Sequence, residues 1–198
     1  MSHDASTENS SDRTQAADGV TRHFAWSNVF VHPDDDPRSG GGFADERTVL
    51  VEYLRDQRLT LELKCTGLDA ADLARRSVPP STMSLLGLVR HMAEVERTWF
   101  RRRMSGQDVP KIYCTDTDRG GDFDGAVGDP TVVAEAWATW RTECAFTDQY
   151  VNDAADLGLV GENGNVLREI LVHMIEEYAR HNGHADLLRE LIDGRVGQ

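Results

Sequence analysis

The sequence predicts an all-α protein, built as a four-helix bundle. Four long segments carry apolar side chains at helical spacing, and no segment shows the alternation of apolar and polar residues that is typical of a strand. A chain of 198 residues is also long enough to bury a full core in one domain. We therefore expect a flexible N-terminal appendage at residues 1–43, followed by one bundle domain at residues 44–198.

The appendage has two parts. Residues 1–22 are polar and without periodicity, which predicts disorder. The apolar patch at residues 23–32 is expected to pack onto the domain or onto a partner. Two prolines and three consecutive glycines in residues 32–42 then interrupt regular structure before the bundle begins.

The first half of the bundle domain contains two long helices. We expect the first over about residues 45–65 and a short helix at about 69–77, before a pair of prolines. The second long helix spans about 84–104, with Ser84 as its N-cap.

The second half contains the other two long helices. The third begins at Asp129 and Pro130, an N-cap followed by proline at the first helical position. The fourth runs from Asn165 to Gly194, a natural C-terminal glycine. Residues 105–128 form a loop that is long enough to cross the end of the bundle. The second and third long helices are then expected to run parallel.

Composition limits the partners of the chain. A formal net charge of −13 and a sequence pI of about 4.9 argue against nucleic acid and anionic membrane surfaces. No apolar run approaches the roughly 20 residues that span a bilayer, and the start of the chain lacks a signal-peptide pattern. Three widely spaced cysteines, Cys65, Cys114 and Cys144, fit reduced thiols. We expect a cytoplasmic protein.

The fourth predicted helix carries metal-ligand residues on its apolar side. At about 100° per residue, four side chains fall within an arc of roughly 80° that also holds apolar residues; they are His173, Glu177, His181 and His184. Burying such groups without partners costs about 1–3 kcal/mol for each group. A bound divalent metal would remove that cost.

Two of these residues have the spacing of a ligand pair. Glu177 and His181 are four residues apart, which places them on adjacent turns within reach of one ion. Since two ligands hold a metal poorly, a third is expected from another helix. The best candidate is His91, which lies beside the apolar stripe of the second long helix.

The segments SLLGLVRHMAEVERTWF, around His91, and EEYARHNGHADLLRELIDG, around His181, resemble the DinB-like superfamily. Within it they resemble the branch close to mycothiol-dependent maleylpyruvate isomerase and the mycothiol S-transferases. The resemblance covers about residues 45–195. It implies a four-helix bundle, often a homodimer, with a metal held by His91, Glu177 and His181.

The resemblance also implies a chemistry. Two histidines and one carboxylate leave open positions on a divalent ion, expected to be zinc, with nickel or another metal as alternatives. The implied co-substrate is mycothiol, the small thiol of actinomycetes, and the implied partner is an electrophile. The expected reaction is metal-dependent S-transfer or thiol-assisted isomerisation. The alternatives are a metal-dependent hydrolase and a non-catalytic metal-binding or stress-response module.

Other polar and aromatic residues have simpler interpretations. His173 and His184 are expected to be satisfied in the core or to support the site, although either as a fourth ligand would favour a structural metal. Glu94, Glu96 and Glu176 are expected as surface charges, with a general base as the alternative. Solvated positions are expected for the charged residues Arg101, Arg102, Arg103, Asp116, Asp118, Asp122 and Asp124. Core positions are expected for the aromatic residues Trp99, Trp137 and Trp140.

Overall fold

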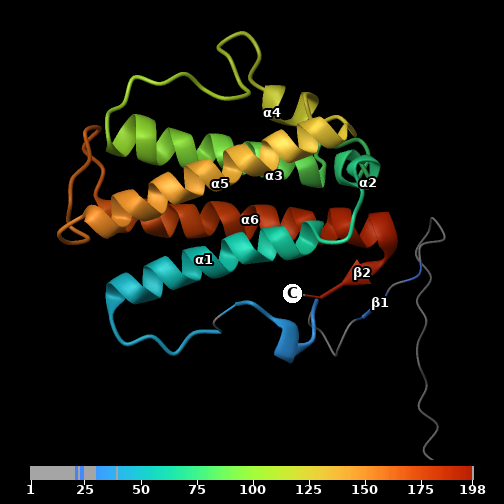
Figure 1. Ribbon diagram of the computed structural model, residues 1–198, viewed down its shortest axis with the longest axis horizontal. Helices are drawn as coiled ribbons and strands as arrows, with labels where there is room; N and C mark the ends of the chain where they lie inside the picture. Colours follow the sequence, from blue (N-terminus) through green and yellow to red (C-terminus); the bar gives the residue numbers. More distant parts are fainter. Residues whose placement is uncertain (1–20, 22, 25–29, 39, 198) are drawn as a thin grey trace, which may run out of the picture.

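Four long helices form the structure, a computed structural model that describes residues 21, 23–24, 30–38 and 40–197 (Figure 1). They are α1 (Glu46–Cys65), α3 (Leu85–Glu96) with its continuation η2 (Arg97–Met104), α5 (Pro130–Asp153) and α6 (Leu167–Asp193). Two short helices accompany them, α2 (Ala70–Ala74) and α4 (Gly121–Asp124). The all-α class predicted from the sequence is confirmed.

The helix ends follow from local sequence. The side chains of Asp45, Ser84 and Asp129 accept hydrogen bonds from backbone N–H groups in the first turns of α1, α3 and α5. These caps satisfy donors that have no partner within the helix. At the other end of α6, Gly194 has φ +78°, a left-handed conformation that favours glycine.

Two contacts between α3 and α5 show that the helices are parallel. Arg90 lies 3.8 Å from Glu135, and Arg101, further along the same helix, lies 2.6 Å from Glu143. Residue numbers therefore rise together, and the two helices run in the same direction (Figure 1). Residues 105–129, which we call the crossing segment, return along the outside of α3 and include α4.

The second long helix changes its geometry at Arg97. Residues Arg97–Met104 form a π-helix, and beyond it the amide of Ser105 still donates to the carbonyl of Phe100, five residues earlier. The sequence predicted one uniform helix here, and periodicity cannot resolve such a widened turn. The helix nevertheless stays against α6, because the Trp99 and His173 rings lie 4.6 Å apart.

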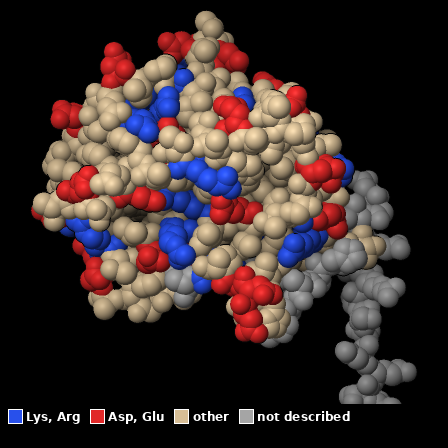
Figure 2. Space-filling view, in the orientation of Figure 1, with Lys and Arg blue, Asp and Glu red and all other residues tan. Residues whose placement is uncertain are grey.

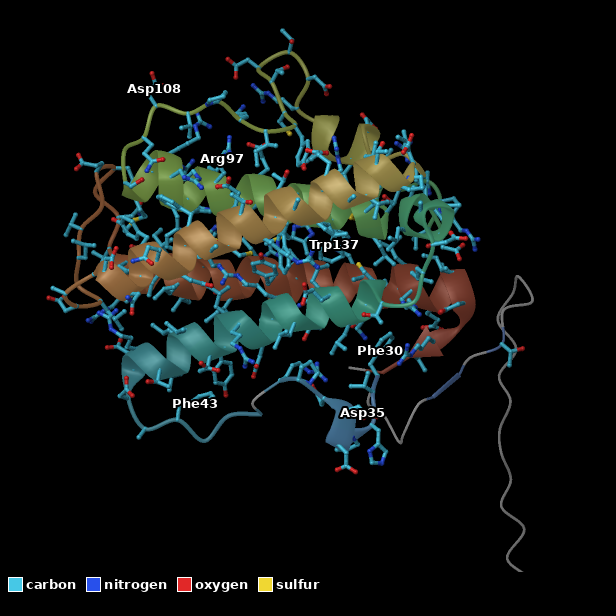
Figure 3. All side chains as sticks on the ribbon, in the orientation of Figure 1. Phe30, Asp35, Phe43, Arg97, Asp108 and Trp137 are labelled. Carbon is cyan, nitrogen blue, oxygen red and sulfur yellow. The ribbon has the colours of Figure 1, made fainter. Side chains whose placement is uncertain are left out.

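Residues near the two ends of the chain lie together. Strand β1 (His23–Phe24) pairs in parallel with β2 (Arg195–Val196). Phe30 is buried beside the end of α1 (Figure 3), with Lys64 Nζ 4.1 Å and Arg195 Cζ 4.0 Å from its ring centroid. A 3₁₀ helix, η1 (Pro33–Asp35), follows. Residues 25–29 of the apolar patch, and residues 1–22 except Thr21, lie outside the described residues.

The surface shown in Figure 2 carries acidic and basic side chains side by side, without a large area of one sign. Within the described part of the chain, no helix combines the length and apolar character that crossing a bilayer requires.

Candidate metal site

Helices α3 and α6 bring three metal-ligand residues together. His91 comes from α3, and Glu177 and His181 come from adjacent turns of α6. One ligand atom from each residue lies within 4.8 Å of the other two. In the described part of the chain, no other group of three or more such residues lies this close.

The distances within this group suit a small divalent ion. His181 Nε2 lies 3.7 Å from Glu177 Oε2, and the rings of His91 and His181 are 4.6 Å apart. Ligand atoms around a tetrahedral zinc ion, with bonds of about 2.0–2.2 Å, lie about 3.4 Å apart. Two imidazoles and a carboxylate are also the donor types that zinc accepts. The residues present therefore fit the group.

His91 is oriented by a carboxylate from the crossing segment. Its Nδ1 lies 2.7 Å from Asp122 Oδ2. Burial acts to raise the pKa of Asp122, but the hydrogen bond and charge of His91 outweigh it and hold that pKa below its ordinary value. Since an ionised carboxylate only accepts, this contact keeps a proton on His91 Nδ1, and Nε2 is the nitrogen that has a lone pair when the ring is neutral. This carboxylate and histidine arrangement is typical of metal ligands.

His181 is held in the form that binds metals. Burial, together with the neighbouring His91, His184 and Arg180, lowers its pKa to about 4. The ring is therefore neutral at physiological pH. A neutral imidazole has a free lone pair for a ligand bond.

His173 and His184 lie beside the group. His173 Nε2 is 3.3 Å from Glu177 Oε1, the oxygen that does not face His181. His184 Nδ1 is 3.4 Å from His181 Nδ1. Each contacts one member of the group, whereas neither is among the three residues whose ligand atoms converge.

Two aromatic rings flank the site. Phe123 stacks on His91 with a centroid distance of 5.3 Å, and the edge of Trp99 meets His173 at 4.6 Å. The Arg103 guanidinium lies 4.3 Å from the centre of the Trp99 ring. The site is only partly closed, because the side chains of His91 and Glu177 remain 25% and 24% exposed.

Three acidic residues differ from their expected positions. Asp122 is buried against His91 and is not a solvated loop residue, and Glu94 and Glu96 are buried and are not surface charges. Glu94 lies under the crossing segment, and Glu96 lies between the helices. Sequence reasoning missed Asp122 because the return of a long loop onto a helix has no periodic signal. Its position directly before Phe123 was the only local indication of a buried turn.

Arg101, near the end of the second long helix, contacts α5. Arg101 Nε donates to the buried Glu143, and its guanidinium lies 4.0 Å from the centre of the Phe146 ring. Arg101 therefore ties η2 to α5.

Trp140 is buried, as expected, and its Nε1 donates to Tyr178.

A helical bundle with two histidines and one glutamate between its second and last long helices defines a class of candidate metalloproteins. Comparison with known proteins gives the family. A family model described as mycothiol-S-transferase matches residues 49–194. The chain belongs to this DinB-like family.

A solved structure supports the fold. It is described as the conserved protein of locus from Enterococcus faecalis, with a TM-score of 0.51 and 16% sequence identity. The match covers 76% of this chain and 99% of the other. At this identity the likeness shows the fold alone. The comparison with curated proteins gives no match.

Proposed function

We propose that this protein is a metal-dependent transferase in which His91, Glu177 and His181 hold a divalent ion, zinc in the first instance. The co-substrate is a small thiol, mycothiol by family, and the second substrate is an electrophile. The observation that carries the proposal is the convergence of the three ligand atoms within 4.8 Å in a partly exposed site.

The number of ligands favours catalysis over a structural role. Structural zinc sites have four protein ligands, whereas catalytic sites have three and keep a position open. Here three residues converge, and His173 and His184 each contact a ligand residue without joining the group. A bound divalent ion with an open position lowers the pKa of a thiol placed there and so supplies a thiolate near neutral pH.

The residues of the chain divide the remaining work. Asp122 fixes the His91 ring, so that Nε2 and not Nδ1 faces the site. His173 Nε2 lies 3.3 Å from Glu177 Oε1, where its N–H can orient that carboxylate toward the ion. Phe123 and Trp99 limit the access of water from two sides. S-transfer and thiol-assisted isomerisation both begin with the same thiolate, and a metal-dependent hydrolase would use the same ligands.

The test begins with metal content per chain by elemental analysis of untagged protein. Loss of free thiol is then followed after addition of mycothiol and a halobimane acceptor, with and without a chelator. His91→Ala is compared with Glu176→Gln, which changes an exposed carboxylate beside a proposed ligand.

We expect stoichiometric metal and metal-dependent thiol loss in the wild type and in Glu176→Gln, and neither in His91→Ala. Bound metal without thiol loss, over a panel of thiols and acceptors, would contradict the transferase and favour the binding module or the hydrolase. A wild-type protein that binds no metal would contradict the whole assignment.

A further inference from the structure

Two buried charged residues on α3, Arg90 and Glu94, hold the crossing segment beside His91. We propose that both are positioning residues for the metal site: they fix the segment so that Asp122 meets and orients the His91 ring. The proposal rests on the proposed metal role of His91. The orientation of the ring is nevertheless measurable without metal.

Glu94 fixes the early part of the segment. Its side chain is buried, and Oε2 accepts hydrogen bonds from the amides of Ile112 and Tyr113, both at 2.8 Å, and of Cys114 at 3.4 Å. Hydrogen bonds to an ionised group are stronger than those between neutral groups. One carboxylate oxygen therefore fastens three consecutive residues to α3.

Arg90 fixes the later part, one turn earlier on the helix. Its Nε donates to the carbonyl of Asp122 at 2.8 Å, and Nη2 donates to the carbonyl of Gly121 at 3.0 Å. Its guanidinium also lies 3.8 Å from the centre of the Tyr113 ring. Asp122 is thus held twice, through its backbone by Arg90 and through its side chain by His91, the next residue of α3.

Close packing shows that the segment fits this face of α3. A Cβ atom at Gly87 would lie 2.7 Å from Cδ1 of Phe123, which is too close for two carbon atoms. Glycine at this position therefore lets Phe123 approach α3 and stack on His91. A Cβ atom at Gly121 would collide with the carbonyl oxygen of Tyr113. The two fastened parts of the segment therefore also pack against each other.

These contacts connect two residues outside the ligand group to the geometry inside it. If Arg90 or Glu94 loses its polar end, the carbonyl or amide groups that it held turn to water, and the segment moves away from α3. Asp122 then leaves His91 Nδ1, and the ring is free to exchange its tautomers. Loss of such outer partners of a ligand typically costs 10–100-fold in metal affinity.

The experiment measures zinc affinity by competition with a chromophoric chelator in Arg90→Met, Glu94→Leu and Asp122→Ala. Arg90→Met keeps most of the apolar stem and Glu94→Leu keeps a similar volume, while both replacements remove the polar end. The matched control is Arg189→Met, because Arg189 is also buried and donates to two backbone carbonyls, those of Lys64 and Thr66. Circular dichroism confirms the helical fold, and Arg90→Lys replaces Arg90→Met if that variant does not fold.

We expect the zinc Kd to rise 10–100-fold in Arg90→Met, Glu94→Leu and Asp122→Ala, and to change less than twofold in Arg189→Met. The double variant Arg90→Met/Asp122→Ala should be no weaker than Asp122→Ala alone, because Arg90 acts through Asp122. In metal-free protein, the ring ¹⁵N shifts of His91 should show one tautomer, protonated at Nδ1, in the wild type and in Arg189→Met. They should show a mixture in the other variants.

Three results would overturn the proposal: unchanged zinc affinity in Arg90→Met and Glu94→Leu, an equal loss in Arg189→Met, or full additivity in the double variant. Failure of the proposed function is separate. A wild type that binds zinc but transfers no thiol leaves this inference intact. If the wild type binds no zinc, the ¹⁵N shifts still decide whether Arg90 and Glu94 orient His91.

Discussion

The bundle contains two polar clusters, and they are built differently. The first, which we call the core network, is centred on Glu96 and takes in residues from all four long helices. The second is the metal site between α3 and α6. Glu96 is fully buried, whereas the Glu177 side chain is 24% exposed. Both clusters use a carboxylate on an otherwise apolar helix face, but only one is closed.

The core network surrounds its carboxylate with hydrogen-bond donors. Glu96 Oε1 accepts from Arg58 Nε and from the Tyr178 hydroxyl, both at 2.9 Å, and Oε2 accepts from the Thr147 hydroxyl at 2.6 Å. The Tyr178 hydroxyl in turn accepts from Trp140 Nε1 at 2.8 Å. Four helices supply these groups, so the network fixes their register. It leaves no coordination position for a ligand.

The metal site contrasts with this arrangement. Its three ligand atoms lie within 4.8 Å of one another, and Glu177 Oε2 and His181 Nε2 are 3.7 Å apart, beyond hydrogen-bond distance. Lone pairs that face one another do not stabilise each other, whereas they do stabilise a cation. In this bundle, then, the Glu96 carboxylate is surrounded by donors, whereas the Glu177 carboxylate lies beside the side chains proposed as its fellow ligands.

The largest expected effect is on the core network. Glu96→Ala leaves the Arg58 guanidinium buried beside a cavity, and breaking one side of a buried ion pair costs about 3–5 kcal/mol. Urea unfolding of metal-free protein should show this loss, while His91→Ala should lose less than about 1 kcal/mol because His91 is partly exposed. Equal losses in the two variants would show that the clusters do not differ in this way.

The next effect concerns added zinc. At a free concentration 100 times Kd, zinc should stabilise the wild type by about 2.7 kcal/mol. The same addition should leave His91→Ala unchanged, while that variant keeps its helical circular dichroism. Glu176→Gln is the matched control and should respond as the wild type does, since Glu176 is exposed and is not among the converging ligand atoms. Stoichiometric metal retained by His91→Ala would contradict the ligand assignment.

A smaller effect separates two neighbouring residues of α6. Tyr178→Phe removes a hydroxyl that donates to Glu96 and accepts from Trp140, with an expected loss of about 1–2 kcal/mol in urea unfolding. Zinc affinity should change less than twofold, although Glu177 is adjacent in sequence. Tyr150→Phe, which removes a partly buried hydroxyl bonded to a backbone carbonyl, provides the comparison for loss of one ordinary hydrogen bond. A large fall in zinc affinity in Tyr178→Phe would mean that the two clusters are coupled.

The sequence predicted the helices and one of the two clusters. Helical spacing placed Glu177 and His181 on one face of α6, and that spacing survives folding because it is local. His91 was the best third candidate because it lies beside the apolar stripe of its helix, and the family resemblance implied the same residue. Asp122 and the core network were not predicted, because their partners lie far apart in the chain. Glu96 and Tyr178, for example, are 82 residues apart, and no local pattern encodes such a contact.

The smallest effect on stability is expected from modification of the cysteines. The order in which the cysteines react compares how open the core network and the crossing segment are to solvent. Cys144 belongs to the core network and is buried, as is Cys65, whereas Cys114 lies half-buried on the crossing segment. Burial raises the pKa of Cys65 to about 12 and that of Cys144 well above its ordinary value. Burial also raises the pKa of Cys114 above its ordinary value. Thiolate is the reactive form, so iodoacetamide should modify native protein at Cys114 alone.

Because burial raises the Cys114 pKa above the ordinary value of a thiol, the rate of this modification should still be rising between pH 7 and 9. Mass spectrometry of peptides identifies the modified residue, and Cys114→Ser is the control that should remain unmodified until urea is added. All three cysteines should react in urea. Modification of Cys144 ahead of Cys114 in native protein would show that the core network opens more readily than the crossing segment moves, which is the reverse of what the burial of Glu96 and Tyr178 implies.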